Sequence, residues 1–217
     1  MRTQMIVPIV EGVGEERALP KLVRRWLQHR RFDRWFEVPD RAVNAKGCGN
    51  LKTAYDPRRH LGIEHYVTAA LRAGSADAIL VVLDADKECL HRARGQGLGP
   101  ELLRRAREVA GGVPVAVVVA NRTYEAWLLA GRAALGRCPL VTDKAGLRDI
   151  CDPEIRAGGK EVMGTFIDDT YSPPVHQPTL SEAMSFSPGS QARSPSLAKL
   201  LRDLDRLTRE ARSRRTA

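Results

Sequence analysis

The sequence lacks the features that mark membrane-spanning, secreted and zinc-binding proteins. No apolar run approaches the roughly 20 residues that a helix needs to cross a bilayer. The apolar run nearest the amino end, residues 5–10, is short and contains a proline, so it does not match a signal peptide. The cysteines form no CxxC pair and no Cys/His spacing that fits zinc; they are Cys48, Cys89, Cys138 and Cys151. We therefore predict a soluble, cytoplasmic protein with free thiols and no membrane contact.

The chain has no internal repeats, and its 217 residues suit one large domain or one domain with an appendage. A hydrophobic content of 43% is enough for a packed core. The 35 Lys and Arg residues exceed the 26 Asp and Glu residues, which gives a formal net charge of +9. This balance favours a nucleic-acid partner, with a solvated basic surface as the alternative.

Strand and helix patterns alternate over the first 130 residues. The runs at residues 5–10, 78–83 and 113–120 are apolar without polar alternation, which is typical of strands that are covered on both faces. A weaker strand pattern at residues 36–43 is interrupted by Pro39, which favours an edge position. Amphipathic helix patterns lie between them, at residues 15–27, 63–72 and 100–109. The alternation predicts an α/β fold with an open, mostly parallel sheet and helices on both faces.

The composition changes after residue 132. Residues 171–180 contain so many prolines that no regular element is expected, and residues 185–196 have the composition of a linker. A leucine stripe then predicts a last helix, which frays into a basic tail at residues 209–217. We therefore predict an α/β core at residues 1–135 and an irregular extension at residues 136–217 that packs on the core.

Carboxylates follow two of the predicted strands. Asp84 and Asp86 stand one residue apart after the third strand, so their side chains project to the same side and repel one another. Glu11 follows the first strand, and Glu15 lies one helical turn later. If the two strands are neighbours, these oxygens meet at one edge of the sheet and suit Mg²⁺ or Mn²⁺. The alternative is that one aspartate caps the next helix and the other is solvated.

Two further segments carry charged residues of interest. Residues 45–60 read as a loop whose Lys46, Lys52, Arg58 and Arg59 could meet phosphates, or simply form a flexible basic surface. Glu125 stands near the start of a predicted helix at residues 121–130. At this position it could act as a helix-capping group.

The segments EGVGEE and LDAD, each after a predicted strand, resemble the pattern of the TOPRIM domain. This metal-binding domain is shared by topoisomerases, primases and the overcoming-lysogenization-defect (OLD) nucleases. The two motifs lie 73 positions apart, counted from residue 11 to residue 84. The segments NRTYEAWLLA and YSPPVHQPTLSEAM further resemble a TOPRIM-like family of unknown function that occurs among bacterial anti-phage systems. The resemblance extends over roughly residues 5–207.

The resemblance implies a metal-dependent phosphodiesterase that acts on DNA or RNA. Glu11 matches the first-motif glutamate, a metal ligand or general acid–base group. Asp84 and Asp86 match the DxD ligands of Mg²⁺ or Mn²⁺. Glu15 and Glu125 are implied as additional acidic residues of the catalytic site.

The resemblance also implies a basic residue in the site. Lys160 is the residue that would neutralise charge developing on a phosphate.

Other features of these enzymes are not found in this sequence. No P-loop of the GxxxxGK[ST] type is present, so the ATPase motor of the OLD nucleases is absent from this sequence, and a separate partner protein could supply it. No tyrosine has the context of a topoisomerase nucleophile; the tyrosines are Tyr55, Tyr66, Tyr124 and Tyr171.

Two other functions share part of this pattern. A DxD after an apolar strand is also the metal motif of nucleotide-sugar glycosyltransferases, although their first strand leads into a nucleotide-binding loop and not into EGVGEE. A non-catalytic, regulatory or nucleic-acid-binding module on a TOPRIM-like scaffold is the other alternative. Carboxylates that face a phosphate backbone weaken binding unless a metal is present, which disfavours that module.

Overall fold

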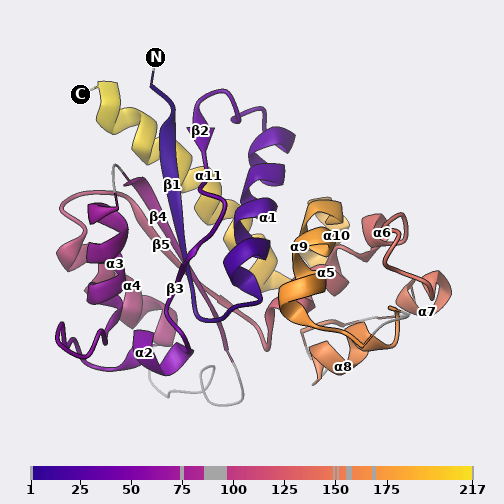
Figure 1. Cartoon of the computed structure of the whole chain (residues 1–217). Helices are drawn as coiled ribbons and strands as arrows, with labels where there is room; N and C mark the ends of the chain where they lie inside the picture. The colour runs from indigo at the N-terminus through magenta and orange to yellow at the C-terminus, as the bar shows by residue number, and fades with distance from the viewer. Residues whose placement is uncertain are drawn as a thin grey trace.

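A parallel sheet forms the centre of the computed structural model, which describes residues 2–73, 76–85, 97–148, 150, 152–154, 158–167 and 170–216 (Figure 1). Within these residues the strand order is β2-β1-β4-β5, with β3 also paired to β1, and every pairing is parallel. The strands are β1 (Gln4–Val10), β2 (Phe36–Glu37), β3 (Val43–Asn44), β4 (Ala76–Asp84) and β5 (Val115–Ala120). The predicted α/β fold with an open parallel sheet is confirmed. Asp86, Cys89 and Cys151 lie outside the described residues.

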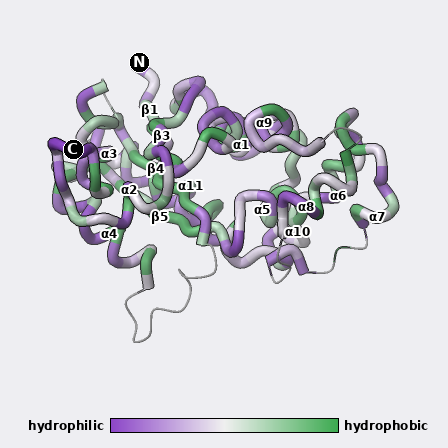
Figure 2. Tube along the Cα trace, turned by 60° about the horizontal axis from the view of Figure 1, so that its bottom comes forward, coloured by the Kyte–Doolittle hydropathy of each residue, from purple (hydrophilic) through white to green (hydrophobic). Residues whose placement is uncertain are grey.

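Each central strand is buried on both faces. In β4, Ala78, Leu80 and Val82 enter one hydrophobic cluster. The alternate residues Ile79 and Val81 enter the other cluster. In Figure 2 hydrophobic segments gather at the centre of the sheet, around β4 and β5. The apolar run without polar alternation therefore has the cause that the sequence predicts, which is a layer of helices on each face.

The two helical layers come from different parts of the chain (Figure 1). One face packs against α2 (Cys48–Lys52), α3 (Ile63–Arg72) and α4 (Leu98–Val109). The other packs against α1 (Glu15–His29), α5 (Tyr124–Ala130), α9 (Pro173–Ala183) and α11 (Pro195–Thr216). The short helix α2 lies within residues 45–60, which we predicted to be a loop.

Pro8 lies in β1, a central strand, although proline cannot donate a ladder hydrogen bond. Gln4 N–H donates to Trp35 O at 2.8 Å, and Val10 O accepts from Ala45 N–H at 2.8 Å, so the even-numbered residues of β1 face β2 and β3. The chain on that side leaves the sheet between β2 and β3. Pro8 thus faces a gap in the neighbouring strand, where no donor is required.

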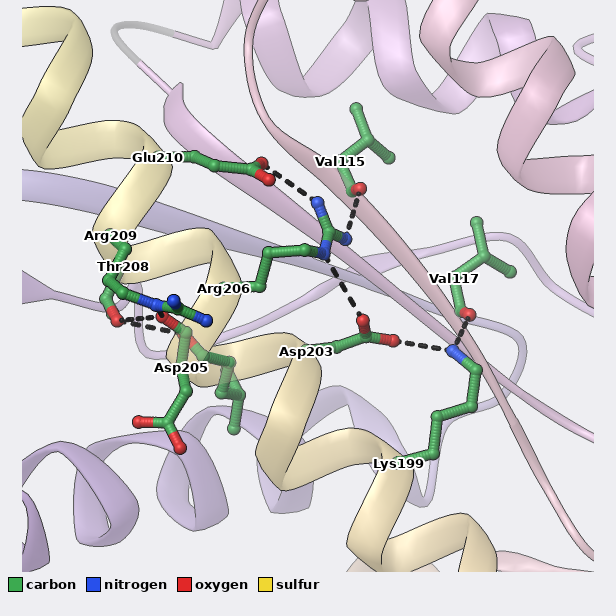
Figure 3. Close-up of polar contacts among 10 residues, drawn as sticks. Val115, Val117, Lys199, Asp203, Asp205, Arg206, Thr208, Arg209 and Glu210 are labelled. Atoms are coloured by element: carbon green, nitrogen blue, oxygen red, sulfur yellow. Dashed lines mark hydrogen bonds and ion pairs between the residues drawn. The ribbon is translucent and has the colours of Figure 1, made fainter.

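The open edge of β5 is closed by side chains of α11 (Figure 3). Lys199 Nζ donates to Val117 O and Arg206 Nη2 donates to Val115 O, both at 2.9 Å. Asp203 holds the two cations in place, at 2.5 Å from Lys199 and 3.4 Å from Arg206. These contacts satisfy backbone carbonyls that would otherwise offer an edge for strand pairing.

The extension is more regular than its composition indicates. Residues 171–180, predicted to be irregular, belong mostly to α9, and residues 185–196 contain α10 (Pro188–Arg193) and the start of α11. Both predictions were wrong because prolines at a first helical turn need no N–H partner. Packing of α9 against α1 also offsets the loss of the helix hydrogen bond that Pro178 cannot donate. The remaining short helices are α6 (Arg132–Leu135), α7 (Lys144–Arg148) and α8 (Gly159–Gly164).

The predicted last helix is present as α11, and it packs on β5 and β4. The boundary at residues 135 and 136 stays a prediction. Cys138 is a buried free thiol. Within the described ranges, no helix combines the length and apolarity that crossing a bilayer requires.

A nearly buried ion pair fixes α4 to the first turn of α3. Arg105 Nη2 lies 2.7 Å from Glu64 Oε2, and the side chains are 11% and 13% exposed. The same guanidinium donates to Lys52 O at 3.0 Å and Thr53 O at 2.8 Å. We expect Arg105→Ala to lower the free energy of unfolding by about 3–5 kcal/mol, because Glu64 is left buried without its partner.

Urea denaturation followed by circular dichroism measures this loss. The matched control is Arg104→Ala, which removes an exposed guanidinium paired with Glu108 at i,i+4 and should change stability by less than about 0.5 kcal/mol. Equal losses for Arg104→Ala and Arg105→Ala would contradict the anchoring role of Arg105.

Candidate active site

Glu11 and Asp84 meet at the carboxyl edge of the sheet. β1 and β4 are parallel neighbours, with Val10 opposite Val82, so the residues that follow them lie side by side. Glu11 Oε2 accepts the backbone N–H of Asp84 at 3.1 Å. The Asp84 residue is only 8% exposed. This is the adjacency on which the predicted metal site depends, although Asp86 is not among the described residues.

A second acidic pair lies at two helix starts on the same edge. Glu15 opens α1 and Glu125 lies in the first turn of α5, positions where negative charge is favourable because of the helix dipole. Glu125 is fully buried, and its Oε1 accepts from Tyr171 Oη at 3.0 Å and Gln177 Nε2 at 2.9 Å. Both donors come from the extension, so the carboxylate of Glu125 joins the extension to α5.

Glu15 and Glu125 are close enough for their charges to interact. Burial raises the pKa of Glu15, and the charge of Glu125 raises it further. The positive charge of Lys160 and the amide of Gln177 act in the opposite direction on the pKa of Glu15. Lys160, on α8, therefore lies close enough to this carboxylate to affect its ionisation.

Tyr124, the first residue of α5, is close enough to the acidic residues for their charges to affect it. It is fully buried, and its hydroxyl lies 2.8 Å from Ser181 Oγ. Burial raises the pKa of Tyr124 far above its ordinary value, and the charges of Glu15, Glu125 and Asp84 raise it further. The charges of three carboxylates on three different elements thus act on this one phenol.

Several buried oxygens of the site lack a hydrogen-bond donor among the described residues. They are Glu125 Oε2, Gln177 Oε1 and Thr123 Oγ1. An unsatisfied buried oxygen costs about 1–3 kcal/mol. A hard cation binds carboxylate, amide and hydroxyl oxygens, so this set fits such an ion.

The ligand set is nevertheless incomplete in the described part of the chain. No three His, Cys, Asp or Glu side chains there are grouped closely enough to hold a metal ion by themselves. Ligation would therefore draw on amide or hydroxyl oxygens, or on Asp86.

Two glycines let the extension approach the acidic residues. A Cβ on Gly14 would lie 2.6 Å from Gln177 Oε1 and 2.8 Å from Pro173 Cβ. A Cβ on Gly159 would lie 2.6 Å from Thr123 Oγ1. Larger residues at either position would push the extension away from the site.

The predicted basic residues differ in their placement. Lys46 lies next to the site, because the following residue, Gly47, donates its N–H to Glu11 O at 2.5 Å. Arg58 and Arg59 are exposed, and their backbone N–H groups bind Asp56 Oδ1. Among the described residues, no contact joins these two arginines to Glu11, Asp84 or the other acidic residues of the site. Lys52 is half-buried at the end of α2.

Sequence reasoning missed the residues that complete the site, which are Thr123, Tyr124, Tyr171 and Gln177. All four stand in the segments NRTYEAWLLA and YSPPVHQPTLSEAM. The sequence of each segment gave a signal by its resemblance to a known family. Their mutual contact, between α5 and α9, is seen only in the tertiary structure.

Comparison with known proteins gives two likenesses of overall shape. The C-terminal region of the Burkholderia pseudomallei OLD protein matches 97% of this chain and 100% of its own, with a TM-score of 0.49 and 13% identity. The C-terminal region of the Xanthomonas campestris pv. campestris OLD protein matches 96% of this chain and 97% of its own, with a TM-score of 0.45 and 13% identity. No family model and no curated protein matches the sequence. At these levels the likenesses assign no function, which must rest on the geometry of the chain.

The raised pKa of Glu15 predicts how stability depends on pH. Between its unfolded pKa near 4.5 and the higher folded value, the folded state binds more protons, so stability falls as pH rises. In metal-free buffer, Glu15→Gln should therefore raise the melting temperature at pH 7, by about 2–4 °C for each kcal/mol gained. The gain should disappear below pH 4.5.

The adjacent Glu16 serves as a control, because its pKa is shifted in the opposite direction. Hydrogen bonds from Asn44 and Arg41 lower its pKa, so its contribution to stability is present above pH 4.5 and is lost as pH falls through the folded pKa. Glu16→Gln should lower the melting temperature at pH 7. Differential scanning calorimetry of both variants from pH 3 to pH 8 tests this, and a Glu15→Gln variant less stable than wild type at pH 7 would contradict it.

Proposed function

We propose that this chain is a Mg²⁺- or Mn²⁺-dependent phosphodiesterase of the TOPRIM type that cleaves DNA or RNA. The observation that supports the proposal is the contact of Glu11 with Asp84 at the carboxyl edge of the sheet, with the buried Glu15 and Glu125 at the starts of the helices that follow β1 and β5. In an open parallel sheet this edge is where ligands bind. Lys160 supplies a positive charge close to Glu15.

The residues would divide the work as follows. Glu11, Asp84 and Asp86 would hold the cation, as the motifs imply, and Glu15 and Glu125 would add negative charge beside it. A divalent cation there would polarise a phosphate and offset the charge that develops during cleavage. Lys160 would bind a phosphate oxygen and stabilise the same charge. Lys46, next to Glu11, would orient the nucleic-acid backbone.

The contact between Glu11 and Asp84 favours a nuclease over the two alternatives. In a DxD glycosyltransferase Glu11 would have no duty at the metal, yet its carboxylate lies against Asp84. A binding module without catalysis would gain affinity from cations at this edge, whereas the chain buries carboxylates there.

The biological setting belongs to the proposal as well. The resemblance of the two downstream segments suggests an effector of a bacterial anti-phage system. An ATPase motor of the OLD type would then come from a separate protein. These two suggestions rest on the resemblance and not on the geometry of the site.

The direct test is cleavage of plasmid, single-stranded DNA and tRNA with Mg²⁺, Mn²⁺ or EDTA. We expect cleavage with metal and none with EDTA. Glu11→Gln should lower the rate by about 10²-fold or more, because it keeps the size of the side chain but loses its charge and its capacity to transfer a proton. Glu37→Gln, an exposed acid in β2 at the opposite edge, should cleave at the wild-type rate. Cleavage that persists in EDTA and in Glu11→Gln would refute the proposal.

Metal binding is tested separately by calorimetry with Mn²⁺. Asp84→Ala and Asp86→Ala should each weaken binding by about tenfold or more, since each removes a predicted oxygen ligand. Asp40→Ala removes an exposed carboxylate paired with Arg24 and should leave Mn²⁺ affinity unchanged. A double Asp84, Asp86 variant that binds Mn²⁺ like the wild type would place the metal elsewhere.

A further inference from the structure

Arginines concentrate at the end of the sheet opposite the carboxylates. A groove of about 620 Å³ lies beside Phe32 and Trp35 and is lined by the arginines Arg2, Arg34, Arg209, Arg212 and Arg215, which we call the arginine groove. A smaller hollow of about 380 Å³ shares Arg2 and Arg215 with it and adds Arg214. Figure 1 shows that both chain ends lie here, at the amino ends of the strands.

The groove is built by the end of α11. We predicted a fraying tail from residue 209, but the helix continues to Thr216. Arg209, Arg212 and Arg215 follow one another at intervals of three, so they share one face of the helix. Gln4 Nε2 donates to Ala211 O at 2.8 Å, and Arg215 donates to the Arg2 carbonyl. These bonds attach the helix end to β1 and hold the arginine row in place.

The arginines of the groove have no ion-pair partner among the described residues, and Asp77, which lines the smaller hollow, accepts the backbone N–H of Met5 at 2.8 Å. None of the groove's five arginines forms an ion pair there, and no carboxylate lines the groove. By contrast, Arg206, one turn earlier, binds Asp203 and Glu210. The guanidinium groups of Arg34 and Arg212 lie 3.8 and 4.6 Å from the centroid of the Trp35 ring. Like charges held this close repel one another, and an anionic partner relieves that repulsion.

We propose that the arginine groove binds the phosphate backbone of a nucleic acid, as a contact surface separate from the candidate active site. Arginine offers a planar set of donors that matches phosphate oxygens, and the row on α11 presents several such sets in line. β4 separates the two ends of the sheet by about 26 Å at 3.3 Å per residue. A duplex that reached both would span roughly 8 base pairs at 3.4 Å each. Binding in the groove does not depend on cleavage.

The test is fluorescence anisotropy with labelled duplex and single-stranded DNA of roughly 30 nucleotides, titrated with salt in EDTA so that no cleavage occurs. The variant carries Arg209→Gln and Arg212→Gln. The matched control carries Arg24→Gln and Arg104→Gln, which removes the same charge from arginines that are paired with Asp40 and Glu108. Thermal melting checks that both variants remain folded.

For the groove variant we expect the dissociation constant to rise about tenfold or more. The log–log salt slope on duplex DNA should flatten by about two, one for each lost phosphate contact. The control should change by less than about twofold, since paired and distant arginines contribute little. Equal weakening in both variants would show that only net charge matters, and would overturn the proposal. A groove variant with unchanged DNA binding would also overturn the proposal. If that variant instead lost binding to polyglutamate, the partner of the groove would be an acidic protein.

The two proposals can fail separately. A chain that binds through the groove but never cleaves would refute the nuclease alone. A chain that cleaves while the groove variant binds like wild type would refute the groove alone.

Discussion

The central strand β4 is buried on both faces from Ala78 to Leu83, so its backbone can be satisfied only by the neighbouring strands β1 and β5. This constraint fixes the positions of the other elements. Helices must cover both faces, and the edge of β5 must be closed by Lys199 and Arg206. Polar side chains can then leave the sheet only where the strands begin and end.

The two ends of the sheet carry opposite charge as a result. At the carboxyl end, Glu11 and Asp84 lie against one another beside the buried Glu15 and Glu125. At the amino end, α11 contributes a row of arginines. The amino end of the sheet attracts a polyanion. The carboxyl end attracts a cation, and it attracts a phosphate only when that cation is bound.

The extension converts the acidic edge from an open surface into a partly closed site. Tyr171 and Gln177 reach Glu125 because Gly14 and Gly159 leave room for close approach. Closure removes water from the carboxylates, which raises the pKa of Glu15 and leaves the oxygens of Glu125 and Gln177 without donors. A chain that needed only stability would not keep such a site, since each unsatisfied group destabilises the fold. A bound cation would reverse the sign of that effect.

The sequence by itself determined the α/β class, the buried strands, the helices between them and the acidic residues at the strand ends, because these follow from periodicity and local order along the chain. Only the tertiary structure decided that β1 lies next to β4, which brings Glu11 to Asp84 across 73 positions. It also decided that the proline-rich segment forms α9, and that the tail of α11 stays helical and carries the arginine groove. Local propensity disfavours the first segment because of its prolines, and the second is a run of like charges that repel one another. Their order comes from burial against α1 and from the bonds to β1, which join residues far apart in the sequence and leave no local pattern.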